Sequence, residues 1–260
     1  MDTFTLGLNG KIAVVTGASE GLGRATAERF AQCGAKVGMC ARRKAVLEGA
    51  AEQIRRSTGG DLLAMTCDVT RAAEVEAFVA AVVSRWGGVD ILVNNAGTSA
   101  AAGFEQVDDA RWEADIALKL MAAVRFSRLV IPHMKRRGGG RIINVTTIGG
   151  KAPAAGALPT SVTRAAGINL TKSLATEYAA DRILVNTICL GVVKSAQWER
   201  RITGDPEAFY RQVAGKRGVP LGRLGEAHEF ADLVAFLCSE RAAYITGTAI
   251  NFDGGMSAVV

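Results

Sequence analysis

A glycine-rich segment near the N-terminus has the residue types of a phosphate-binding loop. The sequence TGASEGLGRATAERF starts at Thr16 and lies between a β-branched run and an amphipathic stretch. Glycine lets the backbone turn tightly and approach a phosphate, and a helix N-terminus offers unpaired N–H groups. The strand before the loop and the helix after it favour a dinucleotide-binding site over a simple turn. The predicted contacts in the loop are Gly17, Ser19, Glu20, Gly21, Leu22 and Gly23.

The end of the second predicted strand indicates which dinucleotide binds. It reads Cys40-Ala41-Arg42-Arg43, with no acidic residue to accept the ribose 2′-hydroxyl. Two guanidinium groups can hold a 2′-phosphate instead. We therefore predict that Arg42 and Arg43 bind NADP(H) in preference to NAD(H), although NAD(H) stays possible; the alternative is that both arginines only open the next helix in solvent.

Strand-like runs alternate with amphipathic helical stretches along the chain. The strand-like runs are 11–16, 36–41, 61–66, 90–95, 140–146, 182–188 and 248–253. This alternation predicts an α/β fold of the Rossmann type, a doubly wound parallel sheet of about seven strands with helices on both faces. In such sheets the ligand crevice lies at the carboxyl ends of the strands.

Composition excludes several classes of protein. The five cysteines, Cys33, Cys40, Cys67, Cys189 and Cys238, form no CxxC pair, so we expect reduced thiols and no metal site. The net charge is +6, but the basic residues occur in short clusters such as KRRGGGR without aromatic residues between them, so we expect no nucleic acid partner. The basic surface instead favours phosphorylated or carboxylate ligands.

We expect the chain to form a single domain, 1–260, and the protein to be cytoplasmic. No stretch approaches the roughly 20 apolar residues that a membrane crossing needs, and the N-terminus has no targeting pattern. The one long irregular insertion, at about 194–225, contains Gly, Pro and the aromatic residues Trp198, Phe209 and Tyr210, which we expect to be exposed. We expect a mobile flap there that covers an apolar part of a small-molecule substrate, although an ordinary surface excursion is the alternative.

Several motifs, in their order and spacing, resemble those of the short-chain dehydrogenases/reductases over nearly the whole chain. They are TGASEGLG, CDVT after the third strand, NNAG after the fourth, GRIINV, VNTICLG, VPLGRLGE and the closing ITGTAINFDGGMS. The resemblance implies further cofactor contacts, with adenine at Asp68 and Val69, nicotinamide at Asn94, Ala96 and Gly97, and the loop after the sixth strand at Gly191 and Val193. It also implies a homo-oligomer, a dimer or a tetramer, formed through 108–136, 160–180 and the C-terminal strand.

The positions that match the family's four catalytic residues are all substituted. Where the family has a tyrosine and, four residues later, a lysine, this chain has Thr160 and Arg164. Thr147 matches the family's serine, and Lys119 matches its asparagine. We predict that these four residues line the catalytic site and that Arg164 also keeps the lysine's contact with the nicotinamide ribose.

The substitutes have different chemistry from the residues they replace. A threonine hydroxyl can donate a hydrogen bond, but its pKa is far too high for efficient proton transfer. Arg164 keeps a positive charge, and Thr147 keeps a hydroxyl for the substrate oxygen. Lys119 either shares the pocket with Arg164, which is costly unless an anion lies there, or extends to the surface. Two cations and two hydroxyls in one pocket suit a carboxylate, an enolate or an oxyanion.

Three functions are compatible with this sequence. The first is an NADP(H)-dependent oxidoreductase acting on a carbonyl or alcohol with an atypical active site, in which Tyr210 is the one mobile tyrosine that could donate a proton. The second is a non-redox lyase or isomerase in which Lys119 acts as a base or forms a Schiff base. The third is a catalytically silent, nucleotide-binding subunit.

Overall fold

The computed structural model describes residues 5–195, 202 and 204–260 and contains one seven-stranded parallel sheet. The sheet has the order β3-β2-β1-β4-β5-β6-β7. The strands are β1 (Ile12–Thr16), β2 (Lys36–Ala41), β3 (Leu62–Thr66), β4 (Ile91–Asn94), β5 (Gly140–Thr147), β6 (Ile183–Leu190) and β7 (Ala249–Phe252). The predicted fold class is therefore confirmed.

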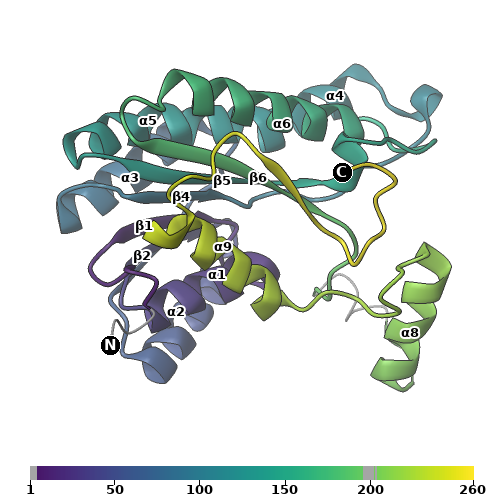
Figure 1. The fold of residues 1–260 in the computed structure, drawn as a ribbon, viewed down its shortest axis with the longest axis horizontal. Helices are drawn as coiled ribbons and strands as arrows, with labels where there is room; N and C mark the ends of the chain where they lie inside the picture. The colour runs from purple at the N-terminus through teal and green to yellow at the C-terminus, as the bar shows by residue number, and fades with distance from the viewer. Residues whose placement is uncertain (1–4, 196–201, 203) are drawn as a thin grey trace.

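Helices cover both faces of the sheet (Figure 1). One face carries α1 (Gly21–Gln32), α2 (Lys44–Thr58) and α9 (Ala227–Cys238), and the other carries α3 (Ala72–Trp86), α4 (Asp109–Ile116), α5 (Ala122–Arg136) and α6 (Thr160–Glu177). Short helical turns are η1 (Phe104–Gln106), η3 (Ile148–Gly150) and η4 (Glu240–Ala242).

Each face has its own apolar core, because successive side chains of a strand point to opposite sides. Along β1, Ala13 and Val15 pack into the core that contains Phe30. Ile12 and Val14 pack into the other core. All of β1 is buried, which explains why its sequence is a continuous apolar run rather than an alternating one.

The chain reverses its winding direction between β1 and β4. From β1 the chain winds outward through β2 and β3 and then returns to add β4 on the other side of β1. Such a switch point opens a crevice at the carboxyl ends of the strands. The glycine-rich loop follows β1 and NNAG follows β4, so both lie at this crevice.

The long helical stretch that begins at Asp109 contains a π-helical segment, η2 (Ala117–Met121), between α4 and α5. A π segment inserts one extra residue into a helical turn and is frequent at functional sites. Lys119 lies at its centre and is buried.

The described part of the predicted flap contains α8 (Pro206–Arg217), which lies to one side of the sheet in Figure 1. The helix starts after Asp205, whose carboxylate accepts from the amides of Glu207 and Ala208, and ends at Gly218 with φ +62°. Tyr210 packs into a small core with Val213, Ala214, Val219 and Leu224. The expectation that Tyr210 is an exposed flap residue is therefore wrong, and Trp198 lies outside the described residues.

The described residues contain no helix that is both long and apolar enough to cross a membrane. The same residues contain no cluster of three or more histidine, cysteine or acidic side chains that could hold a metal ion.

Candidate active site

The glycine-rich loop forms a cradle that excludes side chains. Gly17 has a φ of +64°, which favours glycine. A Cβ atom on Gly23 would lie 2.4 Å from the carbonyl oxygen of Gly17, so no larger residue fits there. No side chain caps the N-terminus of α1, and the first-turn amides of a helix have no intrahelical partner. The loop therefore presents free N–H groups and a positive helix end, which suit a pyrophosphate.

Asn95 ties the NNAG segment to this loop. Its Nδ2 donates to the carbonyl oxygen of Thr16 at 2.9 Å and to that of Gly17 at 3.2 Å. In return, the Thr16 hydroxyl oxygen accepts from the amides of Asn95 and Ala96, both at 3.0 Å. Asn95 is thus a supporting residue that joins the segment after β4 to the loop after β1.

The two arginines after β2 have different surroundings. Arg43 forms an ion pair with Glu20 of the glycine-rich loop and immediately precedes α2. Arg42 is exposed and near Asp68. Burial raises the pKa of Asp68, but hydrogen bonds from Thr70 and the charge of Arg42 outweigh this, so the pKa is lowered. Arg42 is therefore the better placed of the two for a 2′-phosphate, and these residues fit NADP(H).

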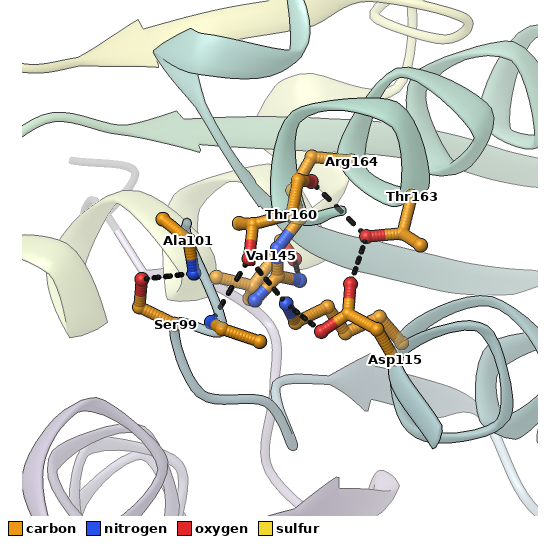
Figure 2. Close-up of polar contacts among 9 residues, drawn as sticks. Ser99, Ala101, Asp115, Val145, Thr160, Thr163 and Arg164 are labelled. Carbon is orange, nitrogen blue, oxygen red and sulfur yellow. Dashed lines mark hydrogen bonds and ion pairs between the residues drawn. The ribbon is translucent and has the colours of Figure 1, made fainter. Parts of the chain in front are cut away.

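Thr160 lies at the junction of three segments (Figure 2). It is the first residue of α6, and its hydroxyl oxygen accepts two hydrogen bonds. One comes from Lys119 Nζ at 2.9 Å and the other from the amide of Ala100 at 3.0 Å. Because both donors point at this oxygen, the hydroxyl's own proton is free to point elsewhere.

Lys119 is held inside the protein by Asp115. The two side chains are 1% and 2% exposed and form an ion pair one helical turn apart. The second carboxylate oxygen of Asp115 accepts from the Thr163 hydroxyl at 2.7 Å (Figure 2). The alternative in which Lys119 extends to the surface is therefore wrong. The carboxylate of Asp115 supplies the negative charge that Lys119 and Arg164 need in order to lie in one pocket.

The pKa of Lys119 reflects these competing neighbours. Burial lowers it, the hydrogen bond and charge of Asp115 raise it, the charge of Arg164 lowers it, and the net direction is downward. Burial also lowers the pKa of Arg164, to about 10, although Asp115 opposes this. Two cations thus share one carboxylate, which leaves the pocket attractive to an electron-rich oxygen.

Arg164 lies one helical turn after Thr160 on α6 and lines the small cavity beside Lys119. Its Nη1 donates to the carbonyl oxygen of Val145 at 2.6 Å. An ideal Cβ on Gly97 would lie 2.6 Å from its Nη2, so the glycine makes room for the guanidinium. Among the described residues, its buried Nε has no hydrogen-bond partner. A buried donor of this kind normally has a ligand or a water as its partner.

A small cavity of about 20 Å³, large enough for about one water molecule, adjoins this guanidinium. Asn94 and Lys119 also line it. Asn94 donates to the side-chain oxygen of Asn144 at 2.9 Å, while no described residue donates to its own Oδ1. Asn94 therefore offers an acceptor, and Arg164 a donor, beside the same cavity.

The other predicted residues lie at the same edge of the sheet. Thr147 ends β5 and is half-buried, but no described hydrogen bond joins its hydroxyl to Thr160. Gly191 follows β6 and packs so closely that a Cβ would lie 2.7 Å from that of Asp253. Val193 forms a bridge with Gly225. Asp68 and Val69 follow β3, which is separated by β2 from β1 and its glycine-rich loop.

Neither histidine belongs to this site. His133 lies in the last turn of α5 beside Arg136, and His228 lies in the first turn of α9. Of the tyrosines, Tyr178 follows α6, and Tyr244 is fully exposed. The residues that the sequence interpretation missed are Asp115 and Thr163; the spacing of Asp115 four residues before Lys119 was a usable signal.

Comparisons with known proteins identify a family and several similar structures. The family model described as enoyl-(acyl carrier protein) reductase matches residues 17–257. The chain is 37% identical to the 3-oxoacyl-acyl-carrier-protein reductase of Vibrio cholerae, over 96% of this chain and 99% of that protein. It superimposes on L-sorbose reductase from Gluconobacter frateurii, complexed with NADPH and L-sorbose, with a TM-score of 0.93, 38% identity, and coverage of 99% and 100% of the two chains.

A second solved structure is similar in the same degree. It is the NADPH-bound short-chain oxidoreductase from Pseudomonas aeruginosa PAO1, described as containing an atypical catalytic center. The TM-score is 0.93 at 37% identity, with coverage of 96% and 98% of the two chains. Together with the fold and the crevice, these matches show that the chain belongs to the short-chain dehydrogenase/reductase family of oxidoreductases.

Proposed function

We propose that the protein is an NADPH-dependent reductase of a small carbonyl substrate, with Lys119, Thr147, Thr160 and Arg164 as its catalytic residues. The glycine-rich loop holds the pyrophosphate, and Arg42 holds the 2′-phosphate, with Arg43 as its neighbour. NADPH in the similar sorbose reductase and Pseudomonas oxidoreductase supports this preference. The protein acts as a homo-oligomer, a dimer or a tetramer, which light scattering measures.

The observation that carries the proposal is the pair of hydrogen bonds accepted by the Thr160 hydroxyl, from Lys119 and from Ala100. With both donors in place, the Thr160 proton points toward a third partner. In the proposal that partner is the carbonyl oxygen of the substrate. When bound in the crevice, NADPH would supply the hydride for the carbonyl carbon.

The proton then moves in two linked transfers. The Thr160 O–H bond breaks as the substrate oxygen takes the proton, and Lys119 Nζ delivers one of its own protons to the Thr160 oxygen. Lys119 ends as a neutral amine and Thr160 as the hydroxyl it began as. This removes the difficulty of the high threonine pKa, because no free alkoxide forms on Thr160 and the acid consumed is an ammonium group of lowered pKa.

The remaining residues hold this pair in place. Asp115 and Thr163 are positioning residues, because they fix Lys119 and do not face the substrate. Arg164 adds positive charge beside the developing alcohol oxygen and holds the nicotinamide ribose. Thr147 supplies a second hydrogen bond to the substrate oxygen.

A non-redox reaction is the second candidate, and the lowered pKa of the buried Lys119 favours it. A lysine that is neutral for part of the time can act as a base or form a Schiff base with a ketone. Borohydride trapping of a substrate adduct at Lys119, with no NADPH consumed, would establish this reaction in place of reduction.

Thr160→Val and Thr160→Ser test the proposal. Valine removes the hydroxyl at nearly constant volume, so we expect turnover of NADPH with a carbonyl to fall about a hundred- to ten-thousand-fold. Serine keeps the hydroxyl and is expected to retain most of the turnover. Calorimetric titration of NADPH should give the same affinity for both variants. Full turnover by the Thr160→Val enzyme would contradict the proposed role of Thr160 as the proton donor.

A further inference from the structure

Charged residues also gather at the opposite edge of the sheet, away from the active site. Lys11 precedes β1, Asp90 precedes β4, Arg141 is the second residue of β5, and Arg182 precedes β6. These four strands are neighbours in the sheet, so their N-terminal ends meet along one edge. Together with Arg137 these residues line a groove of about 350 Å³.

Asp90 is the one acid among these four residues at the strand ends, and both of its carboxylate oxygens already accept hydrogen bonds. Oδ1 of Asp90 accepts from Arg137 Nε at 2.7 Å, and Oδ2 accepts from the amide of Ile12 at 2.8 Å. Asp90 therefore balances Arg137 and is not available to the other cations of the groove, and the second acid that lines the groove is the exposed Glu240.

Arg141 is short of partners although it is mostly buried. Its side chain is 11% exposed, and its Nη2 lies 3.5 Å from Glu240, a side chain that is 68% exposed. Its Nη1 donates to the carbonyl oxygen of the preceding Gly140 at 3.1 Å. Within the described residues, its buried Nε has no partner at all. A buried guanidinium donor without an acceptor is an unusual and costly arrangement that a bound anion would relieve.

Arg182 adds an independent observation. It is the one non-glycine residue in the described chain with a positive φ, at +56°. This conformation is strained for a residue with a side chain, and strain of this kind clusters at ligand sites. No acid of the described residues forms an ion pair with Arg182 or with Lys11, so both charges are available to a ligand.

We propose that this groove is a second ligand site, which binds a small multivalent oxyanion such as a phosphate ester or a polycarboxylate. Arg141 Nε donates from the floor of the groove, and Lys11 and Arg182 close on the anion from β1 and β6. The site goes beyond the proposed reductase function, since Arg141 and Thr147 lie near opposite ends of β5.

Thermal unfolding and calorimetry with inorganic phosphate, pyrophosphate and citrate test the site. The protein is first saturated with NADPH, so that the cofactor's own phosphate contacts are occupied. We expect saturable binding of at least one of the three anions, with a matching rise in the unfolding temperature. Pyrophosphate or phosphate as the better ligand would identify a phosphate site, and citrate would identify a carboxylate site.

Two variants and a matched control make the result specific. Arg182→Gly and Lys11→Gln should each weaken anion binding about tenfold, a loss of about one charged contact. Arg56→Gln removes a charge from the exposed surface of α2, so its affinity should stay unchanged. Glycine also suits the positive φ, so Arg182→Gly should not lower the unfolding temperature without ligand.

Two outcomes would overturn the site. One is the absence of saturable binding of any of the three anions tighter than about 10 mM. The other is an equal rise in unfolding temperature in all three variants, which would show a general salt effect.

Discussion

Lys119 donates to the carboxylate of Asp115, which lies one helical turn earlier, and both side chains are almost completely shielded from solvent. A buried lysine without such a partner loses its proton easily. Asp115 therefore limits how far burial and Arg164 lower the pKa of Lys119, and it helps to orient the ammonium group. The same carboxylate is held by Thr163, so the pair is oriented from α6 as well as from its own helix.

The first prediction concerns the pH dependence of Asp115→Asn. Protonated Lys119 is the proposed donor, so reduction is expected to proceed below the pKa of Lys119 and to be lost as the pH rises through it. Asparagine keeps the hydrogen-bond geometry but removes the charge that raises this pKa. The descending limb of the kcat profile should therefore move to lower pH.

Thr163→Val serves as the control for this profile. This substitution removes the other hydrogen-bond partner of Asp115 without changing any charge. The descending limb of its kcat profile should therefore move less than that of Asp115→Asn. If the pH profiles of the wild type and of Asp115→Asn superimpose, Lys119 is not the proton source.

The second prediction concerns stability. Lys119→Met leaves the carboxylate of Asp115 buried without its cation, and breaking a buried pair in this way typically costs about 3–5 kcal/mol of unfolding free energy. The double variant Asp115→Val, Lys119→Met removes both charges and should recover most of that loss. Urea denaturation measures both. Equal destabilisation by the single and double variants would mean that the two charges do not stabilise one another.

Much of the fold could be predicted from the sequence because the strands are buried on both faces. Runs such as 11–16 and 36–41 match β1 and β2 within one residue. The π segment at Ala117–Met121 could not be predicted, because one extra residue in a continuous helix leaves no sequence period of its own.

The candidate site could be predicted by position but not by orientation. The π segment changes the direction in which the following side chains leave the helix. For this reason the sequence did not decide whether the side chain of Lys119 points into the pocket or toward the surface. Tyr210 was expected to be exposed because its helix was read as a loop. The difference between Arg42 and Arg43 depends on Glu20, which lies 23 positions before Arg43 in the sequence and meets it only in the folded chain.

The third prediction distinguishes these two arginines. Arg42→Ala should weaken NADPH binding about tenfold or more while leaving NADH binding nearly unchanged, because only NADPH carries the 2′-phosphate. Arg43→Ala should have a smaller effect, since Arg43 is already paired with Glu20. Calorimetric titration of both cofactors into both variants measures this. An equal loss of NADPH affinity in the two variants would mean that Arg43 leaves Glu20 to bind the phosphate.

The last prediction concerns the glycine that makes room for Arg164. A Cβ at position 97 would lie 2.6 Å from Nη2 of Arg164, and the guanidinium is the flexible end of a long side chain. Gly97→Ala should therefore displace Arg164 from the Val145 carbonyl rather than unfold the protein, and turnover should fall about tenfold or more. Gly103→Ala is the matched control, because its Cβ would meet nothing closer than 3.8 Å.

A double-mutant cycle shows whether this loss passes through Arg164. In an Arg164→Gln background the guanidinium is gone, so adding Gly97→Ala should cause little further loss, and the two effects should fall short of additivity by about 0.5–3 kcal/mol. Fully additive losses would mean that Gly97 serves the site by close approach to a ligand, independently of Arg164. NADPH affinity measured beside turnover separates the two cases, because close approach to the cofactor would change binding even when Arg164 is absent.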